Sequence, residues 1–218
     1  MGAILSKKYL AYALGEIVLI VVGILIALQI DNWNNERQLR GLEIKYLKEM
    51  IANLKLDLRD IEFNLEFNAE KMKSNLVVAT YTRNKLPYND SLNFHFGNLI
   101  GSTRFVPNTS SYDNFKSKGF EIIKNDSLRR SITHLYSVEY IHIMGFEFVD
   151  DHKYQYEILV PQVIENVKIN QFWQNAEAIA YRDLFNNIKF QSAIVSNIFY
   201  REYMISEYSK QKHQVLEL

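Results

Sequence analysis

The distribution of apolar residues divides the chain into one unbroken apolar stretch and a longer amphipathic remainder. Residues 9–30 read YLAYALGEIVLIVVGILIALQI, and the part from Ile17 to Leu28 contains only aliphatic residues and one glycine. At about 1.5 Å per residue this stretch gives roughly 33 Å of helix, enough to cross the hydrocarbon core of a bilayer. The pattern predicts a single N-terminal transmembrane helix, with residues 1–30 as the anchor and residues 31–218 as an extramembrane domain.

The flanks of this stretch favour an uncleaved anchor. Tyr9 and Tyr12 lie near one boundary and Trp33 near the other, where amphipathic rings prefer the headgroup region. A cleaved signal peptide would have a shorter apolar core followed by a small-x-small cleavage site, and Ala27-Leu28-Gln29 does not provide one. The first six residues, MGAILS, also fit a myristoylation template, but the apolar stretch is a much stronger anchor.

The basic residues on the two sides indicate an orientation. Lys7 and Lys8 directly precede the stretch, whereas Arg37, Arg40 and Lys45 begin seven residues beyond it. The positive-inside rule counts lysine and arginine close to the span. The nearer lysines therefore favour an N-terminus in the cytoplasm and a translocated C-terminal domain.

Glu16 is the only charged residue within the apolar stretch. At 100° per residue, Gly23 and Ala27 fall within about 20° of it on one side of the helix. Gly23-x-x-x-Ala27 is a small-xxx-small pair that allows two helices to approach closely, and Ala11-x-x-x-Gly15 is another on an adjoining face. The candidate residues of the membrane segment are therefore Glu16, Gly15, Gly23 and Ala27.

Two interpretations of Glu16 are open. A neutral carboxyl could form a hydrogen bond across a helix–helix interface and set the register, which is the favoured interpretation. Alternatively, Glu16 could carry a proton or cation, as in a subunit of an ion-driven machine, because ionisable groups in a membrane segment often have such functions. Both interpretations require protein neighbours in the membrane, so a lone monomeric span is the least favoured arrangement.

A long helical pattern follows the polar run Asp31–Asn35, which resembles a hinge. Steps of three and four predict a helix over about 36–85 with this seam: Ile44, Leu47, Ile51, Leu54, Leu58, Ile61, Leu65, Asn68 and Met72. A second apolar face is formed by Tyr46, Leu56, Phe63 and Phe67. Because a two-stranded coiled coil leaves that face in water, a helical bundle explains the pattern better than a free coiled coil.

The remaining segments also predict helices. Pro87 ends the long helix, and Asp90 or Ser91 caps a helix towards Phe105. We expect a short helix capped by Ser110 or Ser111 and ending at Gly119, then a long helix opened by Asn125 and continuing to about Val160. Trp173 falls in an irregular connection, and a last helix covers about 183–212. No segment shows convincing alternation with a period of two, so the predicted fold class is all-α.

Composition excludes several functions. Lys+Arg and Asp+Glu both number 25, so the formal net charge is zero, which argues against a general nucleic-acid binder. The absence of cysteine removes disulfides, thiolate chemistry and cysteine zinc sites. The five histidines lack metal-binding spacing, although Glu147 with Asp150-Asp151-His152 could form part of a metal site; a solvated charged turn is favoured there. His134 and His142 are expected to line the bundle. We find no catalytic constellation and predict no enzyme activity, metal or cofactor.

Two blocks of the sequence resemble one protein family. The first is YALGEIVLIVVGILIALQ at residues 12–29, followed by Asn32-Trp33-Asn34; the second is YDNFKSKG at residues 112–119, followed by IIKN at 122–125. Together they resemble a bacterial family of single-pass membrane proteins of unknown function. The resemblance implies a membrane-anchored helical protein, placed by the orientation argument in the bacterial inner membrane with a periplasmic domain. It supplies no activity, substrate or catalytic residue.

These observations lead to three functional hypotheses. The first is a non-enzymatic helical scaffold or interaction subunit that forms a homo-oligomer or joins other membrane subunits. The second is a subunit of an ion- or proton-coupled membrane machine that uses Glu16. The third is a sensor whose helical domain binds a small ligand and transmits a change through the long helix.

Overall fold

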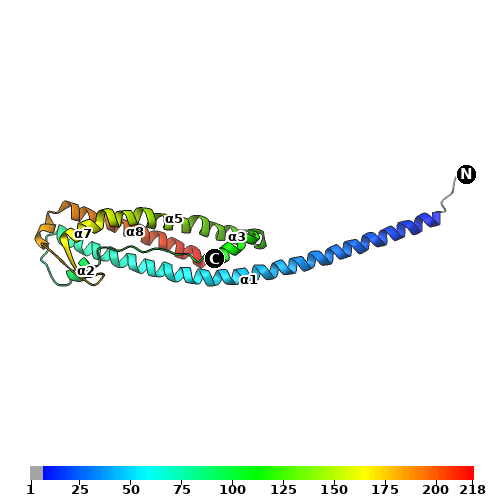
Figure 1. Cartoon of the computed structure of the whole chain (residues 1–218), viewed down its shortest axis with the longest axis horizontal. Coiled ribbons are helices and arrows are strands. Elements are labelled where there is room, and N and C mark those ends of the chain that lie inside the picture. Colours follow the sequence, from blue (N-terminus) through cyan, green and yellow to red (C-terminus); the bar gives the residue numbers. More distant parts are fainter. Residues whose placement is uncertain (1–6) are drawn as a thin grey trace.

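The computed structural model describes residues 7–218, so the myristoylation template at residues 1–6 lies outside them. Its longest element is α1, a helix of 77 residues from Lys7 to Arg83. Figure 1 shows α1 extending far beyond the other elements at its N-terminal end. An 18-residue window of this helix has a mean hydropathy of 2.6, and none of the window is buried. By length and composition, α1 could cross a membrane.

α1 continues without interruption through the polar run at residues 31–35. The expected hinge there is therefore wrong. This run contains neither proline nor glycine, and asparagine and aspartate weaken a helix too little to break one that is propagated from both sides. Residues 9–42 are all exposed, and Glu43 is the first buried residue of α1. The predicted end before Pro87 is confirmed, because the helix stops at Arg83.

The second half of α1 packs in a three-helix bundle. Its partners are a long helical segment over residues 126–166 and α8, which runs from Ile188 to Glu217. In Figure 1, α5, α8 and the second half of α1 lie along one another. The favoured bundle arrangement agrees with the structure. The proposed division of the chain at residue 30 stays a prediction.

The helical segment 126–166 alternates between α-helical and π-helical turns. Its α-helical parts are α4 Asp126–His134, α5 Tyr140–Gly145, α6 His152–Tyr154 and α7 Val160–Asn166. The π-helical parts are η2 Leu135–Glu139, η3 Phe146–Asp151 and η4 Gln155–Leu159. Asn125 caps its start, as predicted, and accepts hydrogen bonds from the amides of Ser127 and Leu128.

The π-helical turns keep one row of side chains inside the bundle. Residues recur in this buried row at every fourth position, namely Glu139, Ile143, Glu147, Asp151, Gln155, Leu159 and Val163. In a regular α-helix each step of four residues overshoots a full turn by about 40°, so six steps would move the row about 240° around the axis. The wider i→i+5 turns absorb this overshoot.

Short elements cover the ends and one side of the bundle. They are α2 Leu92–Gly97, α3 Ser110–Lys118, η1 Phe120–Ile122 and η5 Tyr181–Phe185. The existence of α3 and its termination at Gly119 agree with the prediction, but the predicted cap is wrong, because the helix begins at Ser110 and its N-cap is Thr109. α2 stops at Gly97 and not near Phe105. The segment 98–109 is irregular because its polar backbone groups bond to side chains of the bundle.

The all-α prediction is wrong in one place. Strands β1 Val167–Gln171 and β2 Asn175–Ala178 form an antiparallel hairpin. Trp173 lies in its turn and not in an irregular connection. The strands have five and four residues and include a register shift, so they present too little alternation to be recognised in the sequence.

The predicted seam of α1 has two positions in each seven-residue repeat, and the structure agrees with only one of them. Leu54, Ile61 and Asn68 are buried, as expected, but the intervening buried residues are Asp57, Asn64 and Lys71 in place of Leu58, Leu65 and Met72. The second face is partly covered, since Tyr46 packs on Phe115 and Phe67 packs on Trp173. The apolar pattern misplaced the seam because most of the buried positions of α1 are polar.

Two apolar clusters fill the bundle on either side of these polar residues. One cluster contains Ile61, Phe105, Tyr140 and Tyr208. The other contains Val78, Phe96, Leu159 and Phe190. Between them lies a polar layer, formed by these buried residues: Asn64, Asn68, Lys71, Asn75, Asn98, Glu147, Asp151, Gln155, Asn197 and Arg201.

Gly97→Ala should destabilise the protein, because a Cβ at this position would lie 2.8 Å from the backbone nitrogen of Asn175. We expect a loss of about 1–3 kcal/mol from this overpacking against rigid backbone. Gly145→Ala is the matched control, since a Cβ there meets no atom within 4 Å, and it should gain about 0.5–1 kcal/mol from its helical position. Thermal unfolding of the full chain in mild detergent measures both; equal effects would contradict the close packing of α2 on the hairpin.

Candidate functional site

The candidate residues of the apolar stretch are all exposed on α1, with Glu16, Gly23 and Ala27 on one face and Gly15 on an adjoining face. Glu16 and Gly15 line a shallow groove on this helix together with Tyr12. A Cβ at Gly15 or Gly23 would meet no atom within 4 Å, and Ala27 is exposed. The helix therefore offers this face to a neighbour, and the roles assigned to these residues stay predictions.

The proposed interface anchors are also exposed. Tyr9, Tyr12 and Trp33 project from α1 with most of their side-chain surface accessible. This exposure is compatible with contact to lipid headgroups, which is what the sequence predicts for them.

The most constrained chemistry in the chain lies in the polar layer of the bundle. Arg201 on α8 and Asp151 on η3 form a salt bridge, and both side chains are 0 % exposed. The guanidinium also donates to Asn68 Oδ1 on α1 at 2.8 Å and to the carbonyl oxygen of Gly101 at 3.3 Å. One side chain thus joins all three helices and the irregular segment 98–109.

Amide side chains extend this network. Gln155 Nε2 donates to Asn197 Oδ1 at 2.8 Å, and the backbone amide of Gly101 donates to Gln155 Oε1 at 3.3 Å. Asn197 and Asn75 both donate to the carbonyl oxygen of Leu99, at 3.1 and 3.0 Å. Since buried polar groups are costly without partners, these amides position residues 99–101 between the helices.

Lys71 is a second buried cation in the layer. Its ammonium donates to Asn98 Oδ1 at 2.5 Å and lies 4.8 Å and 5.3 Å from the ring centroids of Phe67 and Trp173. It forms no salt bridge with any residue in the described range 7–218. Burial lowers the pKa of Lys71 to about 8, and the two aromatic rings partly compensate the lost hydration.

Two buried carboxylates hold the irregular segment against the bundle. Glu147 accepts hydrogen bonds from the amide of Phe105, at 2.8 Å, and from the hydroxyl of Tyr208. Asp57 accepts from the amide and side chain of Asn108, at 2.8 and 2.7 Å, and from the hydroxyl of Tyr140 at 3.1 Å. Burial raises the pKa of Glu147 to about 6 and also raises the pKa of Asp57.

The predicted solvated turn around residue 150 is therefore wrong in part. Glu147 and Asp151 are buried, because the π-helical turn directs both into the bundle, whereas Asp150 and His152 are exposed. His134 and His142 do not line the interior: both are more than half exposed, and they contact Glu139 and Tyr203 at the surface.

The carboxylates of the polar layer are held by other groups of the chain. Within residues 7–218, no group of three or more histidine or acidic residues could hold a metal ion. The buried carboxylates are bonded to amides, hydroxyls or Arg201, so they serve as fixed acceptors. The sequence does not predict this layer, because Glu147 and Asp151 look like part of a solvated turn and Lys71 and Arg201 stand in no recognisable motif. The four-residue repeat from Glu139 to Gln155 is the signal that could have located it.

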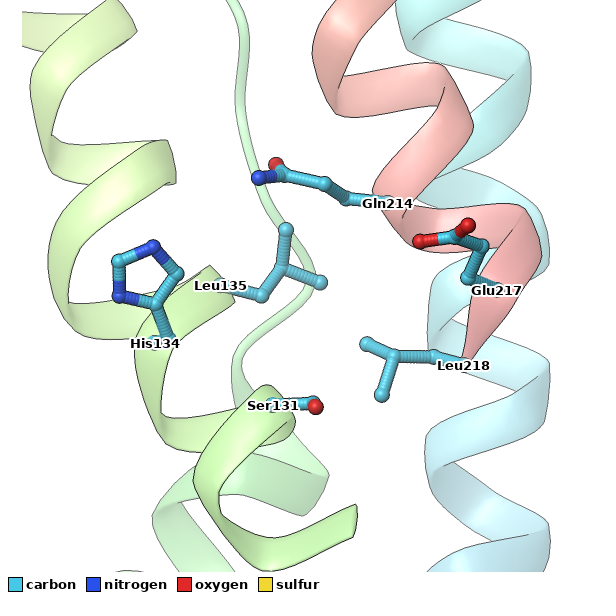
Figure 2. Close-up of a pocket in the computed structure, with 6 residues that line it drawn as sticks. All are labelled: Ser131, His134, Leu135, Gln214, Glu217 and Leu218. Carbon is cyan, nitrogen blue, oxygen red and sulfur yellow. The ribbon is translucent and has the colours of Figure 1, made fainter. Parts of the chain in front are cut away.

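A small surface pocket lies where α8 meets α4 and η2. Figure 2 shows His134 and Leu135 on one wall and Gln214, Glu217 and Leu218 on the other, with Ser131 below. Its volume is about 230 Å³. The nearest charges are already paired, since Glu139 contacts His134 and Lys210 and Glu217 contacts His213. This pairing leaves the pocket without a convergent set of charged groups.

The fold and the polar layer define a class of protein: a helical bundle whose first helix extends into a stretch apolar enough to cross a membrane. A protein-family model matches residues 16–159, about two thirds of the chain. The chain belongs to this family, which is described as a family of unknown function (DUF6090). No curated protein and no solved structure matches it. The expected membership of a family of unknown function is confirmed.

Arg201→Met should destabilise the full chain by about 3–5 kcal/mol, because it leaves the buried carboxylate of Asp151 without a charged partner. Adding Asp151→Leu should recover most of the loss, since the uncompensated charge is then removed. Denaturant unfolding in mild detergent measures both variants. A single variant with nearly wild-type stability, or a double variant no better than the single one, would contradict the role of this ion pair.

Glu147 should make stability depend on pH between 5 and 7.5. Its pKa rises from 4.5 to about 6 on folding, so the folded state binds its proton more tightly. The stability that it contributes is complete below pH 4.5 and is lost as pH rises through 6. Relative to Glu147→Gln, the wild type should lose about 1 kcal/mol between pH 5 and pH 7.5.

Comparison of denaturant midpoints for these two proteins isolates Glu147 from the other titrating groups. This comparison is needed because burial lowers the pKa of His95, which acts in the opposite direction over the same range. A difference between the two proteins that does not change with pH would show that Glu147 is not buried in this way.

Proposed function

We propose that this protein is a membrane-anchored, non-enzymatic interaction subunit that associates through the apolar half of α1, with itself or with other membrane proteins. One observation carries the proposal. The residues of the apolar stretch are exposed along their whole length, whereas the side chains of the polar layer are buried inside the bundle. The apolar stretch is therefore the surface that we propose to have a partner in the membrane.

The chemistry of that segment favours a protein partner as well as lipid. Lipid accommodates the aliphatic residues, but a carboxyl such as Glu16 is costly in a hydrocarbon environment unless it is paired or hydrated. Gly23 and Ala27 lie on the same side as Glu16 and leave space for a second backbone. A second helix on this face would give the Glu16 carboxyl a hydrogen-bonding partner.

The continuity of α1 supports a structural role. From the apolar stretch to the bundle there is no break in the helix, and residues 31–42 form an exposed stalk of roughly 18 Å. Association in the membrane would therefore fix the position of the bundle above it. We propose the inner membrane of a bacterium as the location, with a cytoplasmic N-terminus and a periplasmic bundle.

Disulfide formation between single cysteines tests this interface, since the chain has no cysteine of its own. Ala27→Cys should form a disulfide-linked dimer in isolated membranes under mild oxidation. Leu25→Cys lies at nearly the same depth but about 160° around the helix and should form little. Equal yields at the two positions would mean random collision, and no dimer at either would leave only an unlike subunit as partner.

Three further substitutions in the Ala27→Cys protein distinguish the roles of Gly23 and Glu16. Gly23→Leu should reduce the disulfide yield, because a large side chain separates the helices, whereas Val21→Leu on the other side should not. Glu16→Gln should keep the yield, since an amide can still form the interhelical hydrogen bond. Loss of the protein's cellular function with retained assembly in Glu16→Gln would favour the alternative, an ion- or proton-coupled machine.

A further inference from the structure

A cleft of about 290 Å³ lies at the end of the bundle remote from the N-terminal half of α1. One wall comes from η4 and α7, with Tyr156, Val160 and Ile164, and the opposite wall from the hairpin turn, with Phe172 and Trp173. Figure 1 shows α7 at the bundle end that is farthest from the N-terminus. Tyr156, Ile164, Phe172 and Trp173 are each more than half exposed, so a cluster of large apolar side chains surrounds the cleft.

The hairpin turn holds the side chain of Trp173 at the cleft. This residue has a φ of 64°, in the left-handed region, a conformation that glycine or asparagine adopts at a lower conformational free energy. Its amide donates to the carbonyl oxygen of Gly97 at 3.0 Å, and its own carbonyl accepts from Asn98 Nδ2 at 2.9 Å. Phe67 and the buried ammonium of Lys71 contact the ring from α1. A strained position that holds a large aromatic ring at a cleft points to a binding function.

The lining of the cleft defines the chemistry of its ligand. No charged residue lines it, and most of the lining is apolar or aromatic. The polar groups of Gln155 and Gly101 at its base are already bonded to each other. Ser102 is half-buried, and its hydroxyl forms no hydrogen bond within the part of the chain that the structure describes. A ligand that fits this lining is therefore uncharged, has a flat apolar body and carries one hydrogen-bonding group.

We propose that this cleft binds an uncharged, mainly apolar ring compound of about the size of two fused rings. The volume lies at the lower end of the range for small-molecule sites, about 300–1,000 Å³, and excludes a helix, which is about 10 Å across. The aromatic side chains stack on the ring, since offset and edge-to-face contacts with aromatic faces are favourable. Ser102 provides the hydrogen bond that orients it.

The site is coupled to the polar layer through its base. Gly101 and Gln155 line the cleft, and they bond to Arg201 and Asn197 respectively. A ligand that packs on both residues holds the irregular segment against η4. Binding therefore raises the thermal stability of the bundle as well as filling the cleft, because only the folded chain has the site.

Tryptophan fluorescence tests the proposal directly, since the chain has two tryptophans, Trp33 and Trp173. Trp33→Tyr leaves Trp173 as the only one in the full chain, which is kept in mild detergent. Coumarin, an uncharged bicyclic compound, is the probe, and coumarin-3-carboxylate is its anionic analogue. We expect coumarin to quench Trp173 saturably and to raise the unfolding temperature, and the anion to bind at least tenfold more weakly.

A pair of phenylalanine variants separates the cleft from partition into detergent. Phe172→Ala removes a wall of the cleft and should weaken coumarin binding by roughly tenfold, as truncation of an aromatic anchor does. Phe199→Ala removes a similarly exposed phenylalanine of α8 outside the cleft and should bind as before. Unsaturable quenching, equal affinity for the anion, or equal losses in both variants would overturn the proposal. Both variants must unfold cooperatively near the parent temperature for the comparison to count.

Discussion

The arrangement of the bundle depends on the salt bridge and hydrogen bonds that the buried guanidinium of Arg201 forms. The guanidinium contacts Asp151 on η3, Asn68 on α1 and the carbonyl of Gly101, so a shift of any of these elements leaves a buried charge without a partner. Apolar clusters lie on both sides of this layer and provide most of the burial. Because apolar contacts tolerate sliding and hydrogen bonds at a buried charge do not, the polar layer sets the register of the three helices.

The chain beyond the bundle follows from a different constraint. Residues 9–42 of α1 are exposed in the described part of the chain, and Glu43 marks where the helix enters the bundle. In the proposed function, the same continuous helix therefore passes from lipid into water. The part towards its N-terminus would contact lipid and another helix through the Glu16 face. Beyond the stalk, α1 is one of the three helices whose register the polar layer sets.

The sequence predicts the features that local physics determines. Unbroken hydrophobicity locates the apolar stretch, Pro87 limits α1, and the side chain of Asn125 opens the second helical segment. It does not reveal the seam at Asp57, Asn64 and Lys71, because polar residues at buried positions look like a solvent face until their partners are known. For the same reason the sequence does not predict the burial of Glu147 and Asp151, which depends on π-helical turns. The hairpin was missed because its strands are short and its turn residue is a tryptophan. Of the candidate sites, the Glu16 face is predicted from the sequence and stays a prediction, whereas the cleft beside Trp173 could not be predicted.

In the proposed function, the apolar half of α1 has a protein partner in its membrane. The most direct test is the native mass of the complex that contains this chain, extracted from its own membranes in mild detergent and corrected for bound detergent. We expect a mass above that of one chain: a whole-number multiple of 25.7 kDa for self-association, or a larger mass with additional subunits. A corrected mass of 25.7 kDa, stable across protein concentration and detergent, would contradict the proposed function.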